Sequence, residues 1–259
     1  MATDQELETY EELRSAFRAV IPSGKTIAND AVKHVLRNKR ATPEWVKKNF
    51  SALVESIQED AYERYLTAER EAWKTTFSTV FGPLHGKCTT PGEAADLISN
   101  NFYALDKFFL SLTQSRRVRA GTAFEVLIRE FFIHLNYPFT SQPRIDGNPD
   151  FVLPSVEHYD ADPLTVIIFT VKRSLRERWR QIVTEGAKGL GFYLATIDDA
   201  VSAVDLKAMQ KQKIFLVVPA RYKVEIARYK TAKNVITFED FFLSYLDPAM
   251  LRWKRSGIA

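Results

Sequence analysis

Two acids and a lysine near the middle of the chain have the side chains that phosphodiester hydrolysis requires. Asp150 directly follows a proline, Lys172 ends an apolar run, and Glu185 lies 13 residues beyond the lysine. A divalent metal ion prefers hard oxygen ligands, so at least two carboxylates must converge on it. A cation beside the attacking water or the scissile phosphate stabilises the negative charge that develops there. Asp150, Lys172 and Glu185 are therefore candidates for this chemistry.

The elements expected around these residues would bring the two acids together at one edge of a sheet. Residues 151–153 and 164–171 are short apolar runs, rich in β-branched side chains and bounded by prolines, which predicts two strands. Asp150 comes directly before the first strand. A helix predicted over residues 175–187 carries Glu185, whose carboxylate can fold back over the end of the second strand.

Lys172 is expected on the same face of the sheet as Asp150. Thr170 and Lys172 are two residues apart on a strand, and side chains at that spacing point to one face. The side chain of Asp150 can reach that face from the neighbouring strand. A simpler interpretation stays open at this point, because Pro149-Asp150 is typical of a turn and Lys172 on its own could be a surface residue.

A strongly basic stretch begins at the lysine. Residues 172–181 contain five cations and one acid, an excess of four positive charges that equals the net charge of the whole chain. Arginine donates two hydrogen bonds to guanine O6 and N7, and glutamate accepts one from the N4 amino group of cytosine. Arg176, Glu177 and Arg178 at the start of a helix could therefore read two adjacent G·C pairs from the major groove. The alternative is a solvated helix face that packs around Trp179.

These segments together resemble the CCGG/CCNGG group of type II restriction endonucleases, the group that includes EcoRII, PspGI and NgoMIV. The segments that carry the resemblance are Pro149-Asp150, Thr170-Val171-Lys172, Arg176 to Gln181 and Glu185. Enzymes of this group belong to the PD-(D/E)xK superfamily, but their second acid is displaced from the strand to the following helix. Thr170 stands where that acid would be, and Glu185 stands at the displaced position. The resemblance extends over residues 114–189.

The resemblance implies a role for each of these residues. The implied Mg²⁺ ligands are Asp150 and Glu185, and the implied catalytic lysine is Lys172. The residues implied to contact DNA beside them are Arg173, Arg176, Glu177 and Arg178. The last three would read the CC·GG steps of the DNA.

An earlier segment, residues 114–125, is similar to a helix of the same group whose glutamate lies near the metal site. Glu125 matches that glutamate and is the fourth candidate catalytic residue, although an ion pair with Arg129, four residues on, is the alternative. The residues of this segment expected to approach the minor groove or the phosphates are Gln114, Arg116, Arg117 and Arg119. For the arginines we favour phosphate contacts over base reading, because phosphates and sugars receive the larger share of protein–DNA hydrogen bonds.

Composition and periodicity predict an α/β protein with a helical N-terminal part. The 259 residues are 46% hydrophobic and 26% charged, which is typical of a globular chain. Helical spacing of apolar residues predicts an all-helical domain over residues 1–80, and strands alternating with helices predict a catalytic domain over residues 81–259. Separate helices are expected over residues 97–112 and 117–135. The resemblance implies a PD-(D/E)xK nuclease core in the second domain, with a mixed central sheet flanked by helices.

Charge and cysteine content bear on the partner and the compartment. A net charge of +4 is compatible with a nucleic-acid partner. One cysteine fits a reducing cytoplasm, and the longest aliphatic run is too short to span a bilayer. The first residues lack the basic and apolar segments of a secretion signal, so a cytoplasmic protein without membrane contact is expected.

The expected function is that of a Mg²⁺-dependent endonuclease of a bacterial or archaeal restriction system. By resemblance, it would cut double-stranded DNA at a palindromic site with CC·GG steps, leaving 5′-phosphate ends and a 5′ overhang. CCGG is the first expectation for the core of that site, and CCNGG or CCWGG are alternatives. A palindromic site calls for a homodimer or a higher oligomer, and a restriction system calls for a cognate DNA methyltransferase.

Two other functions stay open on the sequence alone. One is a structure-specific nuclease of the same fold, such as a junction resolvase or a repair enzyme. The other is a DNA-binding module that has lost its catalytic activity.

Overall fold

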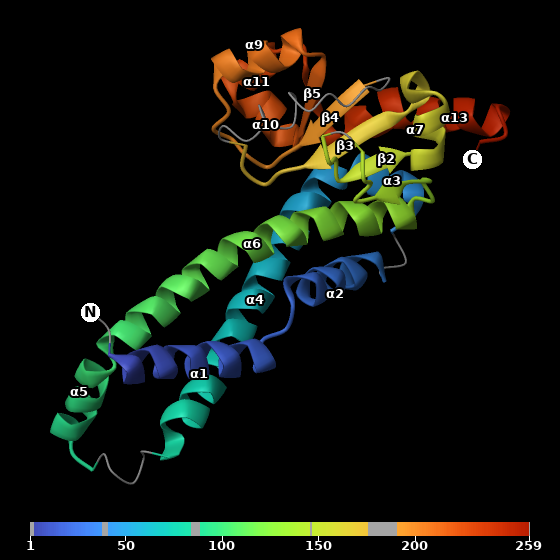
Figure 1. Ribbon diagram of the computed structural model, residues 1–259. Helices are drawn as coiled ribbons and strands as arrows, with labels where there is room; N and C mark the ends of the chain where they lie inside the picture. Colours follow the sequence, from blue (N-terminus) through green and yellow to red (C-terminus); the bar gives the residue numbers. More distant parts are fainter. Residues whose placement is uncertain (1–2, 38–40, 84–88, 146, 176–190, 259) are drawn as a thin grey trace. The chain divides into compact units, whose positions relative to one another are not determined.

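The computed structural model of the chain describes residues 3–37, 41–83, 89–145, 147–175 and 191–258 (Figure 1). The chain divides into two compact units, one of residues Met1–Ile27 and Asp60–Thr122 and one of residues Ala28–Glu59 and Ala123–Ala259. The helices α4 (Phe50–Phe81) and α6 (Phe102–His134) each contribute to both units. The domain boundary predicted between residues 80 and 81 falls at the end of α4, inside the first unit, and it stays a prediction.

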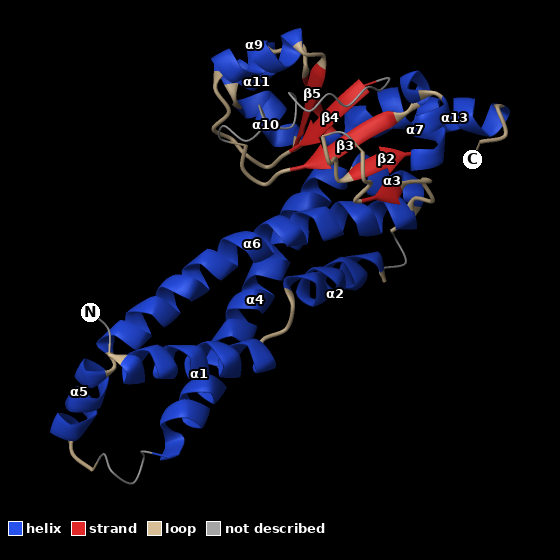
Figure 2. Cartoon of the chain, viewed as in Figure 1, coloured by secondary structure: helices blue, strands red, loops and turns tan. Residues whose placement is uncertain are grey.

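The first unit is built from helices alone in the part of the chain that the structure describes (Figure 2). Its elements are α1 (Asp4–Val20), the start of α2 (Gly24–Leu36), the C-terminal part of α4, α5 (Pro91–Asn100) and the N-terminal part of α6. Thr3 and Thr90 begin α1 and α5 with capping boxes, in which a glutamate three residues later returns the hydrogen bond. The ring of Phe108 lies 5.7 Å from that of Phe17 and 6.2 Å from that of Phe77. The predicted helical N-terminal region is confirmed.

One continuous helix stands where the sequence predicts two. α6 runs without a break from Phe102 to His134, so the expected interruption between residues 112 and 117 is wrong. The intervening residues 113–116 include neither proline nor glycine, and nothing in them stops a helix. Gly121 lies further along, inside the helix, where a glycine costs only about 1 kcal/mol relative to alanine.

The second unit is organised around a sheet with the strand order β1-β2-β3-β4-β5-β6. Its strands are β1 (Thr140–Ser141), β2 (Phe151–Leu153), β3 (Ile167–Val171), β4 (Gly191–Ala195), β5 (Ile214–Val218) and β6 (Val235–Thr237). The first three strands pair antiparallel, whereas β3 to β6 are parallel. Every residue of β3 is buried, as expected for a strand covered on both faces. The predicted α/β class with a mixed central sheet is therefore confirmed.

Short helices connect and cover the strands of this unit. They are α3 (Pro43–Lys48), α7 (Val156–Ala161), α9 (Ala203–Lys211), α10 (Ala220–Glu225), α11 (Ala227–Thr231), α12 (Phe238–Asp240) and α13 (Asp247–Arg255), with a 3₁₀ turn over Pro163–Thr165 and a π-helical turn over Phe241–Leu246. α9, α10 and α11 gather beside β5 (Figure 1), and an apolar cluster that includes Leu206, Met209 and Tyr229 packs them against β4 and β5. No helix in the described ranges combines the length and the apolar surface needed to cross a membrane.

Phe50, the first residue of α4, is the centre of an aromatic cluster in the second unit. Its side chain is fully buried. Its ring centroid lies 4.7 Å from Phe131 on α6, 5.2 Å from Phe238 on α12 and 4.7 Å from Phe242 in the π-helical turn. Phe50 therefore joins α4 and α6, which precede the sheet in the sequence, to α12 and the π-helical turn, which follow its last strand.

Phe50→Ala is expected to lower the free energy of unfolding by about 3–5 kcal/mol, because it removes these ring contacts and leaves a cavity. Urea denaturation followed by circular dichroism measures the loss. Phe102→Ala is the matched control, since Phe102 is 68% exposed and surface substitutions change stability by about 0.5 kcal/mol or less. Equal stability of the two variants would contradict the packing described here.

Candidate active site

The pairing of β2 with β3 brings Asp150 next to Thr170. In this antiparallel pair Phe151 lies opposite Phe169. Asp150, one residue before β2, therefore lies opposite Thr170, one residue further along β3. Directly opposite residues project from the same face of an antiparallel pair, and Lys172 shares that face because it is two residues beyond Thr170. The common face predicted from the sequence is confirmed.

Asp150 is only 6% exposed, and one of its carboxylate oxygens, Oδ2, accepts three hydrogen bonds. The Thr170 hydroxyl donates at 2.8 Å, the Val171 backbone N–H at 2.7 Å and the Lys172 ammonium at 3.1 Å. A buried carboxylate needs such partners, since burying an unpaired charge costs a great deal of free energy. The network holds the Asp150 carboxylate in one orientation, with the Lys172 ammonium beside it.

The second Asp150 oxygen, Oδ1, faces a glutamine that sequence reasoning missed. The side-chain amide Nε2 of Gln142 donates to Asp150 Oδ1 at 3.3 Å and to Glu125 Oε1 at 2.7 Å. The backbone N–H of Gln142 donates to the Asp150 carbonyl oxygen at 2.8 Å. Gln142 therefore links a carboxylate on α6 to one at the start of β2. No sequence signal could have found it, because its place beside Asp150 follows from the register of β1 on β2.

The contacts of Glu125 differ from the alternative that the sequence offers. Arg129, its expected ion-pair partner four residues on, pairs with the neighbouring Glu130 at 2.7 Å. The Glu125 carboxylate accepts a hydrogen bond from Gln142. Glu125 is thus directed toward Asp150, and its catalytic role stays a prediction.

The oxygen atoms gathered here fit a hard divalent cation. Asp150 Oδ1 and the Glu125 carboxylate are ligands of the kind that Mg²⁺ and Ca²⁺ prefer, and each oxygen has a lone pair beyond the one directed at Gln142. Within the described part of the chain no cluster of three or more histidine, cysteine, aspartate or glutamate side chains could hold an ion. The predicted residues that lie outside the described ranges are Glu185, Arg176, Glu177 and Arg178.

The backbone just after the lysine is held by the loop that follows β4. The Thr196 hydroxyl donates to the Arg173 carbonyl oxygen at 3.4 Å, and the Leu175 N–H donates to Asp198 Oδ2 at 2.8 Å. Burial raises the pKa of Tyr229 to about 12, so its hydroxyl stays protonated at neutral pH and donates to the Asp198 carbonyl oxygen at 2.6 Å. Sequence reasoning missed Asp198, although an acid just after a short apolar segment such as residues 191–197 is a signal that could have found it. The Arg173 side chain is exposed.

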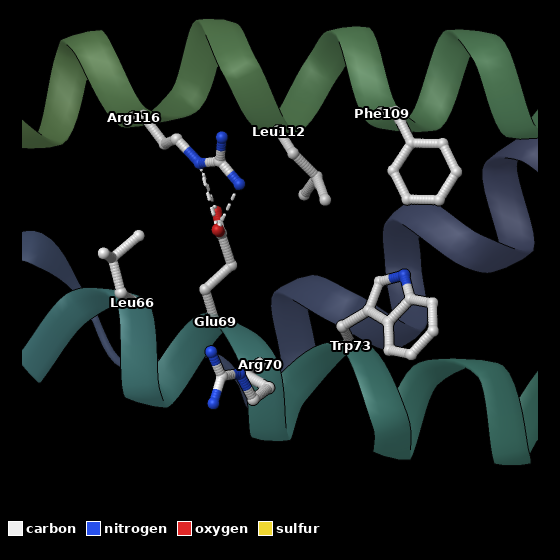
Figure 3. Close-up of a pocket in the computed structure, with 7 residues that line it drawn as sticks. All are labelled: Leu66, Glu69, Arg70, Trp73, Phe109, Leu112 and Arg116. Atoms are coloured by element: carbon white, nitrogen blue, oxygen red, sulfur yellow. Dashed lines mark hydrogen bonds and ion pairs between the residues drawn. The ribbon is translucent and has the colours of Figure 1, made fainter.

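Two of the arginines predicted to contact phosphates make contacts within the first unit. Arg116 forms an ion pair with Glu69 through three nitrogen–oxygen contacts of 2.5–3.0 Å (Figure 3). The Glu69 side chain is 8% exposed and also accepts from the Tyr65 hydroxyl at 2.5 Å. Arg119 donates to the Pro22 carbonyl oxygen at 3.2 Å and lies 5.3 Å from the centre of the Tyr65 ring. Hydrogen bonding to Glu69 raises the pKa of the Arg116 guanidinium above its ordinary value.

The Glu69–Arg116 pair lies in a pocket of about 340 Å³. The lining residues are Leu66, Glu69, Arg70, Trp73, Phe109, Leu112 and Arg116, and Trp73 and Phe109 face each other across it (Figure 3). Gln114 is exposed and lines a second cavity of the same unit, together with Arg119. The side chain of Arg117 lies outside what the structure describes. The DNA contacts of all four predicted residues stay predictions.

Sequence comparisons relate the chain to restriction enzymes. The family model described as EcoRII C terminal matches residues 92–242. The type II restriction enzyme SsoII of Shigella sonnei is 30% identical over 150 residues, which cover 53% of this chain and 48% of that enzyme. The type II restriction enzyme EcoRII of Escherichia coli is 32% identical over 134 residues, which cover 48% of this chain and 33% of that enzyme. The matched regions thus span about half of SsoII and a third of EcoRII.

Solved structures share the fold. Metal-depleted Ecl18kI in complex with uncleaved, modified DNA matches with a TM-score of 0.81 and 21% identity, covering 96% of this chain and 85% of that one. The restriction endonuclease PspGI in complex with substrate DNA matches with a TM-score of 0.66 and 21% identity, covering 91% of this chain and 94% of that one. The predicted PD-(D/E)xK fold and the predicted resemblance are both confirmed.

Asp150→Ala is expected to lower the free energy of unfolding by about 1–3 kcal/mol, because it leaves the Thr170 hydroxyl and the Val171 N–H buried without an acceptor. Thr170→Val added to Asp150→Ala should recover part of the loss, since it removes one of the two stranded donors. Chemical denaturation in metal-free buffer compares the three proteins. An Asp150→Ala protein as stable as the unmodified one would show that the network contributes nothing to folding.

Proposed function

Because the chain belongs to the EcoRII C-terminal family, we propose that it is a type II site-specific deoxyribonuclease that cuts both strands of a palindromic DNA site. Its similarity to SsoII and EcoRII, type II restriction enzymes by name, supports this activity. The observation that carries the proposal is the buried Asp150 carboxylate with the Lys172 ammonium 3.1 Å away. Both residues lie within the segment that the family model matches.

The proposed reaction is the attack of water on a phosphodiester phosphorus, which breaks the bond to O3′ and leaves 3′-hydroxyl and 5′-phosphate ends. Asp150 and Glu125, with Glu185 as the expected further carboxylate, would hold Mg²⁺ through oxygen ligands. When bound, Mg²⁺ supplies Lewis acidity toward water and the phosphate oxygens. Lys172, fixed beside Asp150, stabilises the negative charge that develops on the phosphate or the attacking oxygen.

The proposed recognition site contains CC·GG steps, with CCGG as the first candidate core and CCNGG or CCWGG as alternatives, and cutting leaves a 5′ overhang. Arg176, Glu177 and Arg178 would read these steps from the major groove. The hydrogen bond from Leu175 to Asp198 supports this assignment, because it fixes the backbone from which the three residues follow.

Contacts with the DNA backbone are assigned to the exposed Arg173 and to the segment of the first unit that precedes Glu125. The proposed backbone contacts of that segment are Gln114, Arg116, Arg117 and Arg119. For Arg116 a phosphate would have to compete with the Glu69 carboxylate, so Arg173 is the stronger candidate.

A palindromic site and one active site per chain call for a twofold homodimer, in which each subunit cuts one strand. In a larger symmetric assembly of such dimers, each subunit would likewise cut one strand. A restriction system also requires a methyltransferase that protects the same site in the host DNA. The bacterial source of SsoII and EcoRII supports a role in the bacterial cytoplasm, where that DNA lies.

Lys172→Ala is expected to lower the cleavage rate by about 10²–10³-fold, because it removes charge stabilisation from the transition state while leaving recognition in place. Asp150→Ala should lower it at least as much. The measurement is digestion of a sequenced plasmid in Mg²⁺ with end mapping of the fragments, beside gel-shift binding in Ca²⁺.

Three other outcomes would contradict the proposed function or its active site. Full activity of Asp150→Ala would overturn the active-site assignment. Cutting of branched but not linear DNA by the unmodified protein would indicate a structure-specific nuclease. Site-specific binding without any Mg²⁺-dependent cutting would indicate a DNA-binding module.

Arg173→Ala is expected to weaken binding to all sequences about equally and to reduce the slope of log K against log salt by about one, because one phosphate contact is lost. Arg176→Ala and Arg178→Ala should instead each cost about 1–3 kcal/mol against the cognate site alone. A competition gel shift in Ca²⁺ compares a CCGG-core duplex with one whose outer C·G pairs are exchanged for T·A. If Arg176→Ala and Arg178→Ala both keep the full preference for the cognate site, these two arginines do not read its bases.

A further inference from the structure

A single amide group stands between the two carboxylates of the candidate active site. Gln142 Nε2 lies 2.7 Å from Glu125 Oε1 and 3.3 Å from Asp150 Oδ1, so one nitrogen donates to both. An NH₂ group has two hydrogens, one for each oxygen. The Gln142 side chain is exposed, so solvent and ions can reach this position.

The oxygen of Asp150 that Gln142 contacts is the one left over by the buried network. Oδ2 already accepts from a hydroxyl, a backbone N–H and an ammonium group. Oδ1 is therefore the atom of Asp150 with lone pairs to offer a cation, and the Gln142 amide lies beside it. The same amide turns Glu125 toward the same place.

The backbone of Gln142 is fixed independently of its side chain. Its N–H donates to the Asp150 carbonyl oxygen at 2.8 Å, continuing the register in which Ser141 lies opposite Phe151. Its φ of +49° is in the left-handed region, which is uncommon for a residue with a side chain. The pairing of β1 with β2 thus holds the amide in front of both carboxylates.

Two carboxylates directed at one position repel each other when no cation lies between them. A hydrogen-bond donor between them offsets that repulsion and keeps both side chains in place before an ion binds. Without it the Glu125 carboxylate would have to be ordered and brought toward Asp150 during binding, which weakens affinity.

We infer that Gln142 is a positioning residue of the metal site, which presets Glu125 and Asp150 Oδ1 for a divalent cation. The inference rests on the proposed function, because it assumes that these carboxylates bind the ion. Partners that orient metal ligands in this way are worth about 10–100-fold in metal affinity.

The experiment measures Mn²⁺ binding to the full chain by electron paramagnetic resonance, without DNA. Gln142→Ala and Gln142→Gly are each expected to weaken Mn²⁺ binding by about 10–100-fold. Glycine adopts a positive φ without strain, so the glycine variant keeps the loop even if the alanine variant misfolds. Gln210→Ala, which removes an exposed glutamine from α9, is the matched control and should bind Mn²⁺ as the unmodified protein does.

A second readout separates positioning from a purely structural role. Cleavage by the Gln142 variants should recover as the Mg²⁺ concentration is raised, because the ligands are still present. Cleavage by Asp150→Ala should not recover, because a ligand is gone.

The outcomes distinguish this inference from the proposed function. Unchanged or tighter Mn²⁺ binding by both Gln142 variants, together with loss of binding in Asp150→Ala, overturns the positioning role alone; tighter binding would mean that the amide blocks the site. Unchanged Mn²⁺ binding by Asp150→Ala, or no binding by the unmodified protein, overturns the proposed metal site and the inference with it.

Discussion

The antiparallel register of β2 on β3 is the constraint on which the candidate site depends. It sets Asp150 opposite Thr170, where one carboxylate oxygen meets three donors from consecutive residues. A shift of one residue would turn the Asp150 side chain to the other face of the sheet, away from Lys172. The buried apolar side chains of both strands oppose such a shift, because it would also break their packing, such as the ring contacts of Phe151 and Phe169 with Phe132.

The same register gives the two carboxylate oxygens of Asp150 different hydrogen-bond partners. Oδ2 is committed to the protein, which keeps the carboxylate rigid in the absence of an ion. Oδ1 is directed outward, toward the amide of Gln142 and, through it, toward Glu125. A rigid carboxylate oxygen and an oriented partner would suit the proposed metal site, since little ordering would then be required when an ion and a phosphate arrive.

In the helical first unit, two arginines predicted to contact DNA interact with other residues of that unit. Arg116 and Arg119, which the resemblance to the restriction-enzyme group predicts to approach DNA, already have partners in Glu69, Tyr65 and Pro22. A carboxylate that is mostly buried holds a guanidinium more firmly than an exposed one, because water screens it less. Basic residues in a sequence therefore indicate a nucleic-acid surface only where their side chains are exposed and are not already engaged by a carboxylate, as Arg116 is by Glu69.

The sequence by itself determined the strands around the site, the mixed α/β class and the presence of Asp150 and Lys172 on one face, because these follow from local apolar runs and from the two-residue repeat of a strand. It also carried the motif spacing that identified the family. Only the tertiary structure decided what each polar group contacts: Gln142 reaches a carboxylate 8 residues away and another 17 residues away, and Arg116 reaches one 47 residues away. Such hydrogen bonds depend on strand register and helix packing, which bring together atoms whose separation along the chain shows no pattern.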